Sequence, residues 1–409
     1  MSYFGRYIEF FRVPGMAAAV LASIIGRIPI GITGLAILLF VQGKSGSFAQ
    51  AGAASAVYVL GLAVVAPFLG RIIDRAGPRA VLALCSAVYP LALLMLVALV
   101  SHAAHPLWVA GCAFTAGAAL PPISICMRTL YPRLLHDVDL LHTAYSIDSV
   151  LVETIFILGP ALIAVFVAAG HTVGAVVLAA VCAAAGGTIF LRSPAIRSWT
   201  IRTANAARGK SGLLHYPKLL VVFAATVLYS VAFGLFEVAV TAFAAKKGMP
   251  AAAGLTLALA SAGSAAGALV YGSRSWPLPL PRQLLTALIL MALGILLLAP
   301  LTNIHVFALA GILAGAPMAT VIAVQSILVS RLAPRGMLAE SFTWGATCLL
   351  GGVSSGIAAG GMLAEYVAPS WVVVAAAGAT LLSCVVVWAG LSPAAVAAAA
   401  TFTGTEAEK

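Results

Sequence analysis

The sequence predicts an all-α membrane protein with about twelve transmembrane helices arranged as two bundles of six. Of its 409 residues, 63% are hydrophobic and only 8% are charged, and the mean hydropathy is +1.11. Soluble domains carry about 25% charged residues. A helix needs about 20 mostly apolar residues to cross the hydrocarbon layer. Such stretches recur along nearly the whole sequence, and they lack the polar–apolar alternation that a membrane barrel requires.

The apolar stretches define the expected helices, and turn-forming Gly, Pro and charged residues separate them. We expect helices at residues 14–42, 49–70, 79–100, 107–130, 143–168, 173–191, 219–244, 251–272, 283–300, 305–330, 338–363 and 370–391. The N-terminal segment 1–13, before the first expected helix, spaces its aromatic residues at helical intervals. We expect this segment to lie along the membrane surface.

The basic residues predict the orientation. If the N-terminus is cytoplasmic, most of the 22 Lys and Arg residues fall on the cytoplasmic side and only Lys44, Lys246 and Lys247 fall outside. This bias agrees with the positive-inside rule when both termini are cytoplasmic. We expect an integral protein of a bacterial plasma (inner) membrane. Basic loops facing anionic lipids account for the net charge of +11, so membrane lipids, and not nucleic acid, are the expected partners.

The longest polar interruption divides the chain near its middle. We expect bundles at 14–191 and 219–391, a basic cytoplasmic linker at 192–218 and a cytoplasmic tail at 392–409. A weak repeat links the halves: Arg133 precedes the group His142–Tyr145 by the same interval as Arg331 precedes Glu340–Thr343. Repeats of this kind are typical of transporters whose two bundles rock around a central site. A duplication of the sequence in a protein that does not transport would produce the same repeat.

A dense hydrophilic segment, predicted as a loop, lies between the second and third helices. It matches the pattern G-x-x-x-D-R-x-G-x-R at Gly70, Asp74, Arg75, Gly77 and Arg79. This pattern, the two sets of six helices and the basic linker resemble the major facilitator superfamily over essentially the whole chain. The resemblance implies that fold and transport by alternating access. It also implies that these five residues help to close the cytoplasmic side, with Asp74 near the N-terminus of the eleventh helix, where the helix dipole favours a carboxylate.

A tight hairpin that serves only topology is the alternative for this segment. The acidic residue favours the gating interpretation, because topology alone does not require it. The corresponding segment of the second half begins at Gly272 and reads Gly-Ser-Arg-Ser-Trp, without an acid. We therefore expect the locking residues to be confined to the first half.

Gly159-Pro160 in the fifth helix is similar to the end of a Gly-rich motif of the superfamily's drug/proton antiporters, although Ile155 replaces a usual glycine. Proline bends a membrane helix and glycine permits close helix approach, so a simple kink would explain the pair equally well. An arginine that is common in the fourth helix of those antiporters is replaced by Ala113. The pattern is nearest to exporters, and proton coupling must then use other groups.

Ionisable residues inside a bilayer are costly and usually functional. The candidates for proton coupling or a cavity are Arg27, Arg128, Asp148, Glu153 and Glu237. Arg27 and Glu153 lie at comparable depths, and a carboxylate near an arginine can alternate between protonated and paired forms. A static ion pair is the alternative. We expect Arg128 and Asp148 at an inner gate or at the interface, and Glu237 at the outer mouth or interface.

The sequence contains no phosphate-binding GxxxxGK[ST] loop and no clustered His/Cys ligands, so we expect no enzyme activity, no metal and no cofactor. We expect a monomer whose partners are a small-molecule substrate, protons and lipids. The leading hypothesis is a secondary active transporter that works by alternating access and couples proton entry to efflux of small apolar or amphipathic compounds. The alternatives are a transporter of sugars, amino acids or other metabolites, and a non-transporting receptor or scaffold on the same fold.

Overall fold

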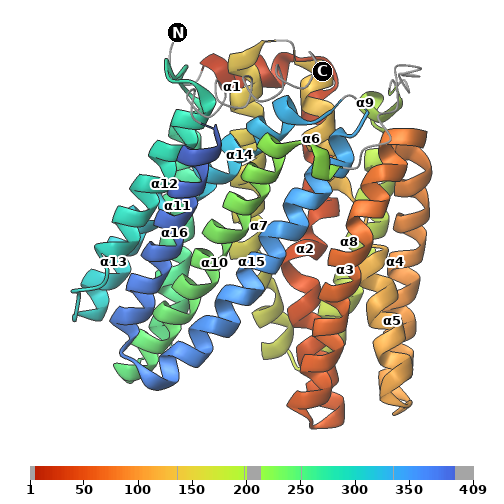
Figure 1. Ribbon diagram of the computed structural model, residues 1–409. Helices are drawn as coiled ribbons and strands as arrows, with labels where there is room; N and C mark the ends of the chain where they lie inside the picture. Colours follow the sequence, from red (N-terminus) through yellow and green to blue (C-terminus); the bar gives the residue numbers. More distant parts are fainter. Residues whose placement is uncertain are drawn as a thin grey trace, which may run out of the picture. The chain divides into compact units, whose positions relative to one another are not determined.

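The computed structural model describes residues 5–135, 137–197, 199, 213–249, 251–334 and 336–391. Regular structure in this part of the chain is helical throughout (Figure 1). The helices are α1 (Gly5–Arg12), α2 (Met16–Ser45), α3 (Phe48–Ala76), α4 (Pro78–Ser101), α5 (Pro106–Ala118), α6 (Ile123–Leu134), α7 (Val138–Ala168), α8 (Thr172–Arg192), α9 (Pro194–Arg197), the 3-10 turn η1 (Leu213–His215), α10 (Pro217–Lys246), α11 (Ala251–Gly272), α12 (Leu280–Leu296), α13 (Ile304–Gly315), α14 (Met318–Leu332), α15 (Leu338–Tyr366) and α16 (Pro369–Leu391).

Eleven helical stretches of the described residues are long and apolar enough to cross a membrane, and α12 is a shorter apolar helix. The predicted all-α membrane fold is therefore confirmed, and the expected number of spans agrees approximately. The predicted tail 392–409 and most of the predicted linker, residue 198 and residues 200–212, lie outside the described residues. The domain limits stay predictions.

Two spans are each broken into two helices. Residues 107–130 were expected to form one helix, but α5 ends at Ala118 and α6 begins at Ile123, with Pro121 and Pro122 between them. Similarly, Pro317 separates α13 from α14. Proline lacks a backbone N–H and disfavours helical geometry in the residue before it, so each proline site interrupts the helical hydrogen bonds. Both breaks lie at similar places in the two halves of the sequence.

The segment expected to be a ten-residue loop is mostly helical, which corrects that prediction. The helix α3 continues to Ala76, and α4 begins at Pro78. Only Gly77 forms the turn, with a φ of 81° that favours glycine, and its N–H donates to the Ile73 carbonyl. Hydropathy predicts a loop here because these polar residues lie outside the apolar layer. Their side chains are nevertheless compatible with a helix, so α3 can continue through them.

Contacts divide the chain into two compact units. The first contains residues 1–141, 151–204 and 334–347, and the second contains 142–150, 205–333 and 348–409. The first turns of α15 thus belong to the first unit and the rest to the second. In the same way, a short segment near the start of α7 belongs to the second unit. These two helices contribute to both units.

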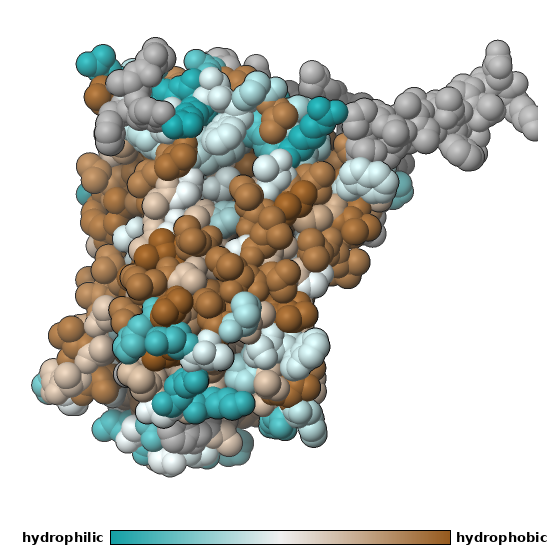
Figure 2. Space-filling view, turned by 90° about the vertical axis from the view of Figure 1, so that its left-hand side faces the viewer, coloured by the Kyte–Doolittle hydropathy of each residue, from teal (hydrophilic) through white to brown (hydrophobic). Residues whose placement is uncertain are grey.

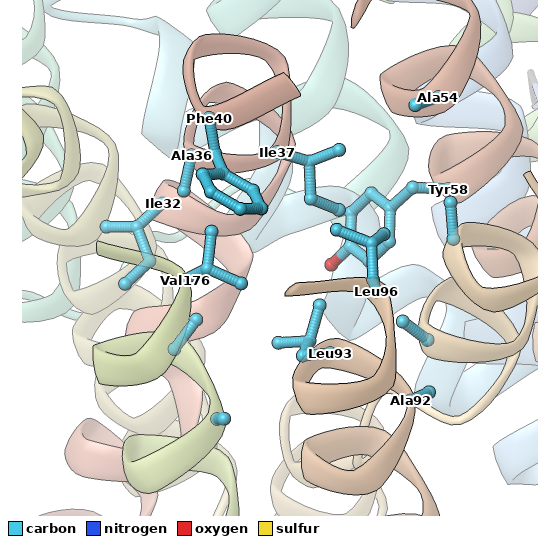
Figure 3. Packing of buried hydrophobic residues seen from close by; sticks show 14 of the residues in the cluster. Ile32, Ala36, Ile37, Phe40, Ala54, Tyr58, Ala92, Leu93, Leu96 and Val176 are labelled. Carbon is cyan, nitrogen blue, oxygen red and sulfur yellow. The ribbon is translucent and has the colours of Figure 1, made fainter. Parts of the chain in front are cut away.

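The core of the first unit lies between α2, α3, α4 and α8. Ile37 and Phe40 of α2 face Tyr58 of α3, Leu93 of α4 and Val176 of α8 (Figure 3). Small alanines fill the spaces between these large side chains, which is how close-packed interiors reach their density.

Glycine contacts bring α2 and α8 together. A Cβ atom on Gly186 would overlap the backbone of Gly26. We expect Gly186→Ala to lower the stability of the protein by about 1–3 kcal/mol, because the two backbones must move apart. Thermal unfolding in detergent measures this. Gly43→Ala is the matched control, since nothing lies within 4 Å of the added Cβ; an equal loss of stability in the control would contradict the packing argument.

The second unit presents apolar side chains to its surroundings. Leu290 and Leu293 of α12 and Leu309 and Leu313 of α13 are exposed. On the face shown in Figure 2, hydrophobic side chains occupy the middle and hydrophilic ones gather towards both ends. This distribution is what a lipid environment requires, because the hydrocarbon layer excludes polar groups.

The helix α1 has the amphipathic character expected of the N-terminal segment. Phe10 is buried against Tyr131, whereas Ile8 and Phe11 are exposed. The Arg6 Nη2 atom donates to Asp139 Oδ2 over 2.9 Å and so ties α1 to the first turn of α7.

Candidate functional site

The carboxylate of Asp74 caps the N-terminus of α15. Asp74 Oδ1 accepts a hydrogen bond from the Ala339 N–H at 3.0 Å, and Oδ2 accepts one from the Glu340 N–H at 2.8 Å. The first amides of a helix have no acceptor within the helix, and the helix dipole favours negative charge there. Two hydrogen bonds to an ionised acceptor make this a strong contact between α3 and α15.

Gly70 allows the same two helices to approach. A Cβ atom there would lie 2.5 Å from Thr343 Oγ1 and 2.8 Å from the Ala339 carbonyl oxygen. Gly70 and Asp74 are one helical turn apart, so they lie on one face of α3. The continuation of α3 as a helix is therefore what aligns these two motif residues against α15.

An ion pair adds to this contact. The Arg71 Nε and Nη2 atoms both donate to Glu340 Oε1, over 3.1 and 2.5 Å. The Glu340 side chain is 4% exposed and that of Arg71 is 43% exposed, so water reaches the guanidinium but hardly the carboxylate. Arg133 of α6 also lies close enough to interact electrostatically with Asp74. The α3–α15 contact, defined here by Gly70, Arg71, Asp74, Glu340 and Thr343, combines a cap, a close approach and an ion pair.

The other motif residues have different surroundings. Arg75 is exposed at the end of α3. Gly77 forms the turn to α4. Arg79 Nη2 donates to the Arg197 carbonyl over 2.8 Å and thereby links α4 to α9. A gating role for the five motif residues stays a prediction.

The candidate ionisable residues lie on four helices. Arg27 of α2 and Asp148 of α7 are fully buried, Glu153 of α7 and Arg128 of α6 are partly buried, and Glu237 of α10 is exposed. The Arg27–Glu153 pair and the other roles assigned to these residues stay predictions.

Helices α2 and α7 meet beside two of these groups. A Cβ on Gly31 would lie 2.6 Å from the Ile155 carbonyl oxygen, and one on Gly159 would lie 2.5 Å from the Gly31 carbonyl oxygen. Arg27 is one turn before Gly31, and Glu153 is two residues before Ile155. Pro160, beside Gly159, is exposed within α7.

The sequence did not reveal Arg71 and Glu340 as partners, nor the contact between α7 and α11 that involves His142, Thr143 and Tyr271. The expectation that locking residues are confined to the first half stays a prediction. The repeat that places His142 and Glu340 at the same interval after an arginine is the signal that could have found both. Among the described residues, no group of three or more His, Cys, Asp or Glu could hold a metal ion.

The family model described as Major Facilitator Superfamily matches residues 17–279. No curated protein sequence matches the chain. Among solved structures, a bacterial homologue of the iron transporter ferroportin, in an outward-facing state, has a TM-score of 0.73 at 15% identity, covering 91% of this chain and 98% of that one.

Two further solved structures are similar. The human organic anion transporter has a TM-score of 0.69 at 16% identity and covers 91% of this chain and 99% of its own. The fucose:proton symporter of E. coli has a TM-score of 0.70 at 12% identity, with 92% and 98% covered. At these identities the likeness establishes a shared fold.

Proposed function

The chain belongs to the major facilitator superfamily, as its sequence resemblance predicts, and we propose that it exports small apolar or amphipathic compounds in exchange for protons. It does so as a secondary active transporter by alternating access, as a monomer in a bacterial inner membrane with both termini cytoplasmic. The α3–α15 contact closes the cytoplasmic side, and the cycle requires this contact to form and break.

Four buried threonine hydroxyls support an apolar or amphipathic cargo, whereas the buried hydroxyls of Ser86, Ser146 and Ser230 have no hydrogen-bond partner among the described residues. Thr33, Thr129, Thr226 and Thr380 are fully buried, and each hydroxyl donates to a carbonyl four residues earlier in its own helix. Their donor capacity is therefore already used. A sugar presents many hydroxyls that need fixed donors and acceptors, whereas an apolar cargo needs few.

The buried Arg27 supports proton coupling, and it is the observation that carries the coupled part of the proposal. A guanidinium that is 0% exposed within an apolar helix is energetically costly, and such groups persist mainly where they act on an ion or a substrate. The close approach of α2 and α7 at Gly31 lies beside it. Glu153 would be the proton-carrying partner.

The relatives of known structure transport different cargoes: one is a homologue of an iron transporter, one carries organic anions and one carries fucose with protons. They share this fold at 12–16% identity. The choice of cargo class for this chain therefore rests on its own side chains.

The test is flux in proteoliposomes with an imposed pH gradient and a broad panel of compounds. We expect an amphipathic compound to drive proton movement in the opposite direction. Flux without accompanying proton movement would contradict the coupling, and flux restricted to sugars or amino acids would favour the metabolite alternative. A folded protein that moves no compound of the panel would favour the receptor or scaffold alternative.

A further inference from the structure

A second buried contact joins the start of α7 to the end of α11. Thr143 Oγ1 donates to the Gly272 carbonyl over 2.7 Å. Gly272 is the last residue of α11, so no backbone N–H of the helix can donate to its carbonyl. This carbonyl therefore needs a donor from outside the helix. His142, the neighbour of Thr143, lies against Tyr271 of α11 with ring centroids 5.7 Å apart and planes at 17°. His142, Thr143, Tyr271 and Gln283 are all buried, and we call them the His142 cluster.

The hydrogen-bond directions in the His142 cluster follow from donor counting. Gln283 Nε2 donates to the Leu278 carbonyl over 2.6 Å, which leaves Oε1 to accept from the Tyr271 hydroxyl at 2.5 Å. A hydroxyl has one hydrogen. At the 3.2 Å contact between Tyr271 and His142 Nδ1, the imidazole must therefore donate its Nδ1–H to the tyrosine oxygen. The chain of donors runs from His142 to Tyr271 to Gln283, from α7 through α11 to α12.

Aromatic packing fixes this chain in place. Trp276 stacks on Tyr271 with centroids 5.8 Å apart and planes at 17°, and its Nε1–H donates to the Tyr271 carbonyl over 3.0 Å. The Tyr271 ring thus packs against the rings of both Trp276 and His142. A buried polar network of fixed direction tolerates few alternative arrangements, because any unpaired member is costly.

The His142 cluster is the counterpart of the α3–α15 contact in the sequence repeat. His142 follows Arg133 by the same interval as Glu340 follows Arg331. The chemistry is reversed: in the first contact a carboxylate of α3 caps the N-terminus of α15, and in the second a hydroxyl of α7 caps the C-terminus of α11. The absence of an acid after Gly272 is therefore compensated by neutral hydrogen bonds.

We propose that His142 is a positioning residue of the transport cycle, which acts through Tyr271 and Gln283 to hold the start of α7 on the ends of α11 and α12. The inference rests on the proposed transport function. Because the contact holds a conformation and does not touch the cargo, its loss changes the maximum rate of transport and leaves KM nearly unchanged.

The test compares His142→Ala, His142→Asn and Tyr271→Phe in proteoliposomes. An asparagine amide can donate from about the position of Nδ1, so His142→Asn should restore most of the rate that His142→Ala loses. We expect His142→Ala to lower the maximum rate by roughly three- to tenfold, as the loss of one buried hydrogen bond implies, and Tyr271→Phe, which removes two, to lower it at least as much. Equal rates for His142→Asn and His142→Ala, or a parental rate for Tyr271→Phe, would overturn the proposal.

A second measurement separates this proposal from the proposed function. Ser146 of α7 is buried, and a cysteine placed there reports the opening of the start of α7 when the six native cysteines are replaced. We expect His142→Ala to increase maleimide labelling of Ser146→Cys by the same three- to tenfold factor, and His142→Asn to leave it unchanged. This holds whether or not a cargo is found. Unchanged labelling in His142→Ala would refute the positioning role even in a protein that transports nothing. Tyr271→Phe, which removes one atom, serves if the alanine variant fails to fold.

Discussion

Asp74→Asn is expected to slow transport by roughly 10- to 150-fold, the largest effect of any single substitution at the α3–α15 contact. The Asp74 carboxylate accepts from two amides at the start of α15, at 3.0 and 2.8 Å. Hydrogen bonds to charged groups contribute about 1.5–3 kcal/mol each. Asparagine keeps one accepting oxygen, but its NH₂ group would face a backbone N–H, and the charge favoured by the helix dipole is lost.

Initial transport rates of Asp74→Asn and the parent measure this effect at equal protein content. Arg12→Gln is the control, because it changes an exposed charge of α1 that lies outside the motif. We expect the control to transport within about twofold of the parent, as exposed charges contribute little. Equal rates in Asp74→Asn and the parent would remove Asp74 from the gate.

Glu153→Gln is expected to abolish substrate-driven proton movement while leaving downhill exchange of the cargo. A glutamine cannot release or take up a proton near neutral pH, and it fills nearly the same space. If Glu153 carries the coupled proton beside the buried Arg27, its replacement fixes the site in one charge state. Proton coupling is then lost completely, whereas binding of the cargo changes little.

A pH-sensitive dye inside proteoliposomes measures this proton movement directly. Glu365→Gln is the matched control, since the same substitution is made at an exposed carboxylate of α15 that is not a candidate for coupling. We expect the control to keep coupled proton movement. Proton movement that persists in Glu153→Gln, with the stoichiometry of the parent, would assign coupling to another group.

Hydropathy predicts the membrane helices well because the hydrocarbon layer imposes one requirement on every span. The predicted 251–272 and 370–391 agree with α11 and α16 to within one residue. Where a local feature competes with hydropathy, the prediction is less complete. The prolines between α5 and α6 break a span that is uniformly apolar, and the helical end of α3 is too polar for hydropathy to detect.

The contacts of the candidate site were only partly accessible from the sequence. A family pattern marked Asp74, but pattern matching assigns no partner to Arg71, whose counterpart Glu340 lies 269 residues away. The His142 cluster contains no acidic residue, so a search for a second copy of the charged motif does not find it. Its function as a cap depends on Thr143 meeting the end of α11, which is a property of tertiary packing.

A reversible cross-link between α3 and α15 tests most directly whether the α3–α15 contact must open during transport. Arg71→Cys and Glu340→Cys, in a background without the native cysteines, can be joined by a short bis-methanethiosulfonate spacer of about the length of the ion pair. We predict that the spacer stops flux, that reduction restores it, and that neither single-cysteine variant responds. Undiminished flux with the spacer in place would contradict the account.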